Sequence, residues 1–114
     1  MSAREFPVGT VFVAETHFED STQAKRRPVV LIGAADYWRD DEKVCVCPIT
    51  TKPPRSQDVP LAWRHAGLRR ESCVRPRPII LRRTRITHRV GGLAPEDLTA
   101  LRAALRHVLD LEAT

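Results

Sequence analysis

The sequence contains no long apolar run. None of its hydrophobic stretches approaches the roughly 20 residues that a membrane-spanning helix needs. Residues 1–7 also lack the apolar core of a signal peptide. These absences favour a protein of the cytoplasm with no membrane attachment. The chain has 114 residues, of which 42% are hydrophobic, so we expect one globular domain over residues 1–114.

Cysteine is scarce and odd in number. The chain has Cys45, Cys47 and Cys73, and no export signal precedes them, which argues against a disulfide framework. Cys45 and Cys47 alternate along an apolar run, so both would point to the same face, and free cysteine is usually buried. No further thiol or imidazole follows at zinc-like spacing. We therefore expect buried thiols, no metal site and no cofactor.

The motifs of common catalytic classes are missing. The sequence has no Gly-rich phosphate loop, no HExxH, no GxSxG and no zinc-finger spacing. The histidines at positions 17, 65, 88 and 107 are scattered. His65 and His88 stand among arginines, whose charge disfavours a further positive charge. A two-histidine ribonuclease of the pancreatic type is therefore unsupported.

Acidic residues are almost absent from residues 64–89. Glu71 is the only acid in that segment, although the net charge of the whole chain is only +5. Positive charge of this density attracts polyanions over about 10 Å, and arginine binds phosphate in bidentate fashion. The pattern predicts a nucleic acid or an acidic protein as partner. The segment carries nine arginines: Arg64, Arg69, Arg70, Arg75, Arg77, Arg82, Arg83, Arg85 and Arg89.

Apolar runs predict about six short strands followed by one helix. The helix begins at Pro95 and runs for about four turns, because leucines recur at three- and four-residue spacing after it. Short strands with a terminal amphipathic helix indicate a mainly β (α+β) domain with a strongly bent sheet or small barrel. The expected strands are residues 8–16, 27–33, 43–50, 57–63, 72–81 (interrupted by Pro76 and Pro78) and 83–90.

Three connections between these strands are polar. Residues 17–26 lack periodicity and predict a loop, and loops of about ten residues are often functional. Residues 34–42 predict a polar turn. Pro53 and Pro54 stiffen a further exposed loop at residues 52–56.

Polar residues stand at the ends of two of the expected strands. Arg27 begins one, and Thr50 and Thr51 end the next. If the strands are neighbours, a guanidinium and a hydroxyl converge on one anion, which suits a phosphodiester. Metal-independent RNA cleavage needs a base for the 2′-hydroxyl, a cation for the phosphorane and an acid for the 5′-oxygen. Taken singly, Arg27 could equally be a structural or surface arginine, and Thr50 a hydroxyl bonded to backbone.

The order of several short segments resembles the MazF/PemK toxin family of bacterial toxin–antitoxin systems. The first two segments are Arg-Pro-Val-Val-Leu-Ile at 27–32 and Val-Cys-Pro-Ile-Thr-Thr at 46–51. They are followed by Gly67-Leu68, by Glu-Ser-Cys-Val at 71–74, and by Gly92-Leu93 before the leucine-rich helix. The resemblance covers residues 8–111, nearly the whole chain.

This resemblance implies an SH3-like β-barrel (CcdB/PemK-like) and a homodimer that pairs with a small acidic antitoxin. It implies a sequence-specific, metal-independent endoribonuclease that cuts single-stranded mRNA, leaving 2′,3′-cyclic phosphate and 5′-hydroxyl ends. Arg27 and Thr50 would be the catalytic arginine and threonine, and Arg27, His17 or Glu19 the general base. The loop of residues 17–26 would gate the RNA, and residues 52–57 would line its groove. The expected RNA-binding residues are His17, Glu19, Gln23, Lys25, Arg26, Thr51, Lys52 and Arg55.

The chain departs from the family pattern at three places. Gly9 is followed by Thr10, Thr22 replaces an acid, and residues 75–78 read Arg-Pro-Arg-Pro where members commonly have Asp-Gln. Two other functions stay open on the sequence alone. One is a non-catalytic member that binds nucleic acid or a partner, and the other is a gyrase-directed toxin on the same kind of barrel.

Overall fold

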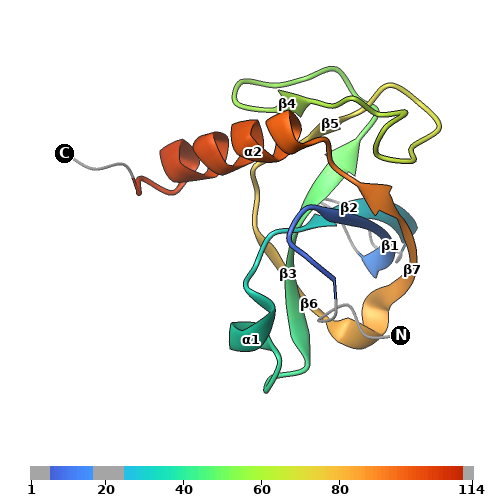
Figure 1. Ribbon diagram of the computed structural model, residues 1–114, viewed down its shortest axis with the longest axis vertical. Coiled ribbons are helices and arrows are strands. Elements are labelled where there is room, and N and C mark those ends of the chain that lie inside the picture. Colours follow the sequence, from blue (N-terminus) through green and yellow to red (C-terminus); the bar gives the residue numbers. More distant parts are fainter. Residues whose placement is uncertain (1–5, 17–24, 112–114) are drawn as a thin grey trace.

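The computed structural model describes residues 6–16 and 25–111 of the chain. Figure 1 shows a bent sheet with a long helix lying along one end of it. The elements, in order, are β1 (Thr10–Thr16), β2 (Lys25–Leu31), α1 (Ala35–Trp38), β3 (Lys43–Thr50), β4 (Val59–Pro60), β5 (Cys73–Val74), β6 (Ile79–Arg82), the 3₁₀ helix η2 (Arg83–Arg85), β7 (Ile86–Gly92) and α2 (Pro95–Val108).

The strands form one antiparallel sheet with β3 near its centre. The order is β4-β5-β3-β2-β1-β7, and β6 also pairs with β3. The first half of β3 pairs with β6 (Lys43 opposite Arg82), and its end pairs with β5 (Thr50 opposite Cys73). The expected interruption of residues 72–81 is confirmed, because β5 and β6 flank Pro76 and Pro78, which cannot donate to a ladder.

The mainly β fold class with a C-terminal helix is confirmed, but the sheet is open. In the described part of the chain, no pairing joins β7 to β4 or β6. The sheet bends strongly, and the β1–β7 register shifts at two places, between Val11 and Phe12 and between Val13 and Ala14. Such irregularities increase local twist and bend a strand.

Each face of the sheet carries its own apolar cluster. Val30 and Cys47 pack in one cluster, against Leu101 of α2. Val29 and Val46 pack in the other, together with Phe12 and Leu31. Neighbouring residues of a strand point to opposite faces, so a strand buried on both faces reads as a continuous apolar run. That is why residues 27–32 show no alternation. Cys45, Cys47 and Cys73 are all buried and free.

Helix α2 begins and ends where the sequence predicts. Pro95 stands in its first turn with Glu96 and Asp97, and its last turn carries Arg106 and His107. These charges complement the helix dipole. Asp97 Oδ2 also accepts a hydrogen bond of 2.8 Å from the backbone N–H of Ala62, which ties the helix to the chain after β4.

Four expectations about the elements are wrong in detail. Lys25 and Arg26 belong to β2, where they pair with Thr16 and Glu15 of β1, and are not loop. The strand expected at 57–63 is only Val59–Pro60, because Pro60 cannot continue a ladder. Residues 83–85 form a 3₁₀ turn. The polar turn at 34–42 contains the short helix α1, whose Trp38 and Tyr37 rings pack edge to face.

Candidate active site

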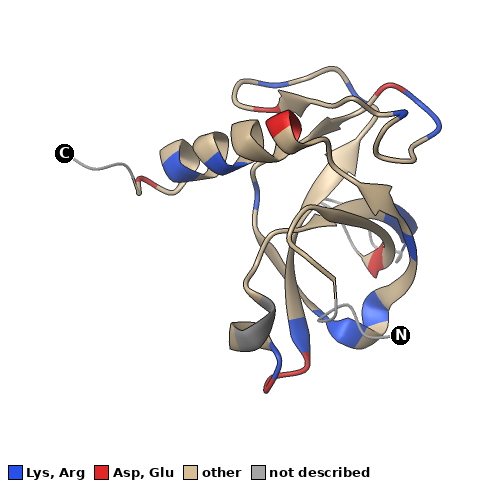
Figure 2. Cartoon of the chain, viewed as in Figure 1, with Lys and Arg blue, Asp and Glu red and all other residues tan. Residues whose placement is uncertain are grey.

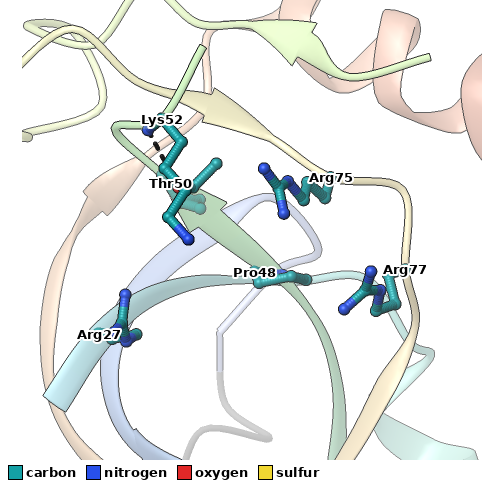
Figure 3. Close-up of a pocket in the computed structure, with 7 residues that line it drawn as sticks. Arg27, Pro48, Thr50, Lys52, Arg75 and Arg77 are labelled. Carbon is teal, nitrogen blue, oxygen red and sulfur yellow. Dashed lines mark hydrogen bonds between the residues drawn. The ribbon is translucent and has the colours of Figure 1, made fainter. Parts of the chain in front are cut away.

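Arg27 and Thr50 come together at the end of the β2–β3 pair. The antiparallel register pairs Val29 with Pro48. Arg27 lies two residues before Val29, and Thr50 lies two residues after Pro48, so both stand just beyond the last paired residues. Both line a small cavity of about 60 Å³ with Pro48, Ile49, Lys52, Arg75 and Arg77. Figure 3 shows these residues around the cavity, with Pro48 between its two sides.

The cavity opens because β3 changes partner. The β2–β3 pairing ends at Pro48, and the next two residues of β3, Ile49 and Thr50, pair with β5 instead. The two strands therefore separate beyond Pro48. Pro48 has no backbone N–H, but its carbonyl accepts a hydrogen bond of 3.0 Å from the N–H of Arg75. This bond fixes the start of the 75–78 segment beside the cavity.

The Thr50 hydroxyl already has one partner. Its Oγ1 accepts a hydrogen bond of 3.1 Å from the backbone N–H of Lys52. The backbone-bonded hydroxyl that the sequence allowed for is therefore present. A hydroxyl has one donor and two acceptor positions, so the Thr50 O–H proton can still be donated to an anion. The bond from Lys52 holds Oγ1 in position at the end of β3.

Arg75 forms a buried ion pair at the back of the cavity. Its Nε lies 3.4 Å from Asp58 Oδ2, and the two side chains are 8% and 4% exposed. Asp58 Oδ2 also accepts a hydrogen bond of 2.8 Å from the backbone N–H of Arg55. Asp58 therefore joins the 52–58 loop to the segment that follows β5.

Two larger cavities adjoin the small one. One of about 340 Å³ shares Arg27, Ile49 and Thr50 with it, and another of about 310 Å³ shares Lys52 with it. The two larger cavities share Thr51 and Ser72. We call the three together the basic groove. Its other lining residues are Lys25, Arg26 and Pro28 in the first large cavity, and Pro53, Pro54, Pro60, Leu61, Glu71 and Cys73 in the second.

The charge of this groove is predominantly positive. Its lining contains two lysines and four arginines, whereas Glu71 is the only acid among the lining residues. Figure 2 shows lysine and arginine spread over the sheet and the loops beside it. Arg26 also pairs with Glu15 at 3.5 Å, but both side chains are well exposed, so this pair is weak. The groove suits a polyanion.

The thiol of Cys73 lines the groove in surroundings that favour its protonated form. Its Sγ lies 3.8 Å from both Asp58 Oδ2 and the carbonyl oxygen of Lys52. Burial, and next the charge of Asp58, raise the pKa of Cys73 above its usual value. A thiol held protonated is a poor nucleophile and a poor metal ligand. Among the described residues, no three His, Cys, Asp or Glu side chains gather as a metal site would need.

The expected RNA-binding residues divide into three groups. Lys25, Arg26, Thr51 and Lys52 line the basic groove. Arg55 lies in the adjoining loop but is not among the lining residues of these cavities. His17, Glu19 and Gln23 lie outside the described residues, as do two of the three candidates for the general base.

Four residues of the site were missed from the sequence. Arg75 and Arg77 line the small cavity, Ser72 lines both large ones, and Asp58 holds Arg75. The high density of arginine between residues 64 and 89 is the feature of the sequence that could have indicated Arg75 and Arg77. The family pattern drew attention to residues 75–78 only as a departure.

Both the sequence and the fold of this chain are similar to those of known proteins. A profile of the family described as "PemK-like, MazF-like toxin of type II toxin-antitoxin system" matches residues 8–109. A search of curated protein sequences gives no significant match. In the described part of the chain, no helix is long and apolar enough to cross a membrane.

Solved structures of several toxins share the fold. The Mycobacterium tuberculosis toxin MazF-mt6 is 23% identical, covering 91% of this chain and 99% of that one, with a TM-score of 0.73. MazF from Deinococcus radiodurans is 22% identical, covering 90% of this chain and 94% of that one, with a TM-score of 0.71. An endoribonuclease from a mycobacterial species was solved with its cognate antitoxin. It is 14% identical, covering 96% of this chain and 100% of that one, with a TM-score of 0.74. The family match over nearly the whole chain shows that this protein belongs to the PemK-like, MazF-like toxins of type II toxin–antitoxin systems.

Proposed function

We propose that this toxin is a metal-independent endoribonuclease that cleaves single-stranded RNA. The observation that carries the proposal is the convergence of Arg27 and Thr50 on one small cavity within a positively charged groove. The mycobacterial structural relative described as an endoribonuclease supports the same activity. A cavity of about 60 Å³ is far below the roughly 300–1,000 Å³ that encloses a drug-sized ligand, so it suits a phosphate group and not a whole nucleotide.

The chemistry is an attack of the RNA 2′-hydroxyl on the adjacent phosphorus. The new bond joins the 2′-oxygen to phosphorus, and the bond to the 5′-oxygen of the next nucleotide breaks. The products are a 2′,3′-cyclic phosphate and a 5′-hydroxyl. A base accepts the 2′-hydroxyl proton and an acid returns one to the 5′-oxygen. Arg27, His17 and Glu19 are the candidates for the base.

Arg27 and Thr50 would act on the phosphate itself. The phosphorane carries one more negative charge than the phosphodiester, and a fixed guanidinium stabilises that extra charge. Arg27 supplies it from the start of β2. Thr50 donates its O–H to a non-bridging oxygen or helps protonate the leaving oxygen. The Lys52 N–H holds its Oγ1 in place for this step.

The rest of the groove would hold the RNA strand and, in turn, the antitoxin. Lys25, Arg26 and Lys52 lie beside the scissile position, where they contact neighbouring phosphates. An acidic antitoxin segment would occupy the same groove, because carboxylates suit the same cations. A relative was solved with its cognate antitoxin. We place the active toxin in the cytoplasm as a homodimer.

A second candidate is a member that binds RNA without cutting it. The arginines at 75 and 77 favour it, because extra cations in the cavity strengthen ground-state binding as much as catalysis. This version predicts salt-sensitive RNA binding and no products.

Cleavage in the presence of chelator distinguishes the two. Purified protein is incubated with a long 5′-labelled RNA in EDTA, and the product ends are tested for cyclic phosphate. We expect cleavage by the wild type and cleavage slower by about 10²-fold or more by Arg27→Ala. Failure of the wild type to cleave, or full cleavage by Arg27→Ala, would contradict the proposal.

A further inference from the structure

The second large cavity of the basic groove differs chemically from the rest. It has a volume of about 310 Å³ and is lined by Glu71, the only acid among the lining residues of the groove. In the part of the chain that the structure describes, no cation pairs with Glu71. A carboxylate repels phosphate, so this cavity does not suit the backbone of a nucleic acid. We call it the Glu71 pocket.

The size and walls of the Glu71 pocket suit one nucleobase. Its volume of about 310 Å³ is at the lower end of the roughly 300–1,000 Å³ that encloses a drug-sized ligand. Leu61 and three prolines supply apolar surface against which a flat ring can lie. The proline rings are rigid, so little conformational freedom is lost on binding. These prolines are Pro53, Pro54 and Pro60.

The wall of the Glu71 pocket offers hydrogen-bond acceptors and few donors. Its prolines have no N–H. The N–H of Leu61 donates to the Ser72 carbonyl at 3.1 Å, and the Ser72 hydroxyl donates to the Arg70 carbonyl at 2.8 Å. The hydroxyl oxygen of Ser72 is therefore left to accept, as the carboxylate of Glu71 does. The hydroxyl of Thr51 supplies a donor.

The Glu71 pocket adjoins the place of the scissile phosphate. It shares Lys52 with the small cavity, and Thr51 of the pocket directly follows Thr50 of the small cavity. Figure 3 shows Lys52 next to Thr50. Consecutive Cα atoms are about 3.8 Å apart. A phosphate beside Thr50 and a base in the pocket can therefore belong to the same nucleotide or to adjacent ones.

Among the four RNA bases, guanine fits this set of groups best. Its Watson–Crick edge, which proteins read in single-stranded RNA, carries two adjacent donors, N1–H and the N2 amino group, beside the O6 acceptor. One carboxylate can accept from both donors, and a hydroxyl can donate to O6. Adenine and cytosine place an acceptor nitrogen next to the amino group, which a carboxylate repels. Uracil has one N–H between two carbonyl oxygens.

We propose that the Glu71 pocket binds a guanine base, with Glu71 accepting from N1–H and N2 and Thr51 donating to O6. Ser72 offers a further acceptor to the amino group. This inference rests on the proposed function for the RNA strand, but it concerns which base is bound and not the cleavage step. It makes Glu71 a specificity-determining residue of this toxin.

Binding of 2′-O-methyl RNA, which cannot be cleaved, tests the proposal. A set of pentamers carries uracil at every position except the centre, which is guanine, hypoxanthine, adenine, cytosine or uracil. Each pentamer can shift along the groove, so the register need not be known. By fluorescence anisotropy with the full-length protein, we expect guanine to bind at least about tenfold more tightly than adenine, cytosine or uracil. Hypoxanthine lacks the N2 amino group and should lie between.

Glu71→Gln should remove most of the preference for guanine. Glutamine keeps the size of the side chain, but its NH₂ group is a donor, so it cannot accept from both N1–H and N2. Loss of a negative charge also tightens the binding of every pentamer, so the informative quantity is the ratio of guanine to adenine affinity. Glu96→Gln is the matched control and should keep that ratio. Glu96 is exposed in the first turn of α2 and lines none of the three cavities.

Each outcome of the binding series supports or overturns the proposal. Equal affinity of the wild type for all pentamers would overturn it, as would tightest binding of adenine or cytosine, or an unchanged ratio in Glu71→Gln. If the wild type prefers guanine but cleaves no RNA in EDTA, the proposed ribonuclease fails and the guanine site stands. If it cleaves RNA but binds all pentamers equally, the ribonuclease stands and the guanine site fails.

Discussion

Asp58 Oδ2 lies 3.4 Å from Arg75 Nε, and the pair joins two sides of the groove that are far apart in sequence. One partner ends the loop before β4 and the other follows β5. Because both side chains are nearly buried, the charge that remains after loss of its partner is not solvated by water. The pair is therefore a sensitive point for the stability of the groove.

Replacing Asp58 by Asn should destabilise the fold. It leaves the Arg75 guanidinium buried without its counter-charge, which costs about 3–5 kcal/mol for a buried pair. Urea unfolding of wild type and variant measures the difference. Arg26→Ala is the control, because it breaks the exposed pair with Glu15 and should cost at most about 1 kcal/mol. Equal losses for the two variants would show that the Asp58 pair is effectively solvated.

Arg27 and Thr50 should differ in their effect on cleavage. Arg27→Ala removes the phosphorane-stabilising cation, and we expect kcat/KM to fall by about 10²–10³-fold or more. Arg27→Lys keeps the positive charge but loses the two parallel N–H donors of the guanidinium. It should therefore recover only part of the lost kcat/KM. Thr50→Val removes one hydroxyl donor and should cost about tenfold or more.

Single-turnover cleavage of one RNA under excess enzyme gives these rates. Urea unfolding of each variant checks that it is folded. A Thr50→Val variant with the rate of wild type would remove Thr50 from the mechanism and leave its hydroxyl a purely structural acceptor for Lys52.

Lys52 should contribute charge and little else. Its backbone N–H holds the Thr50 hydroxyl whatever the side chain is, so Lys52→Ala should retain that bond. We expect weaker binding of a non-cleavable 2′-O-methyl RNA. The slope of log K against log salt should become shallower by about 0.7, the value for one single-strand phosphate contact. Fluorescence anisotropy over a range of salt concentrations measures both, and an unchanged slope would show that Lys52 makes no phosphate contact.

Cys47 should make the protein less stable at alkaline pH. Burial raises the pKa of Cys47 to about 12 in the folded protein, whereas an unfolded thiol titrates near about 8.5. Between these values the unfolded chain has lost the proton and the folded chain retains it, so rising pH favours unfolding. The stability is fully present below about pH 8.5 and falls by up to about 1.4 kcal/mol per pH unit above it.

Unfolding free energies of wild type and Cys47→Ala at several pH values above about 8.5 test this. The variant starts from a lower stability because it leaves a cavity in the core. The informative quantity is the slope against pH, which should be shallower in Cys47→Ala. Parallel slopes would mean that Cys47 ionises in the folded protein as it does in the unfolded chain.

Local pattern was enough for much of the fold. The span of β3, the start of α2 and the break between β5 and β6 follow from residues close in sequence: a strand-forming run, a proline at a helix start, and two prolines that cannot pair. The short helix α1 was missed, because four residues carry too little periodicity to separate a helix from a turn. The convergence of Arg27 and Thr50 on one cavity could also be anticipated, once the two strands were taken as neighbours.

Only the tertiary structure decided which other residues share that site. Asp58, Arg75 and Arg77 are separated from Arg27 by 31 to 50 positions, and no local rule connects them. They meet because β3 changes partner after Pro48 and brings the start of the 75–78 segment against it. By itself, the sequence determined strand ends bearing an arginine and a threonine. Long-range pairing set a second pair of arginines across from them, because contacts between distant strands depend on register and burial, which a single stretch of sequence does not contain.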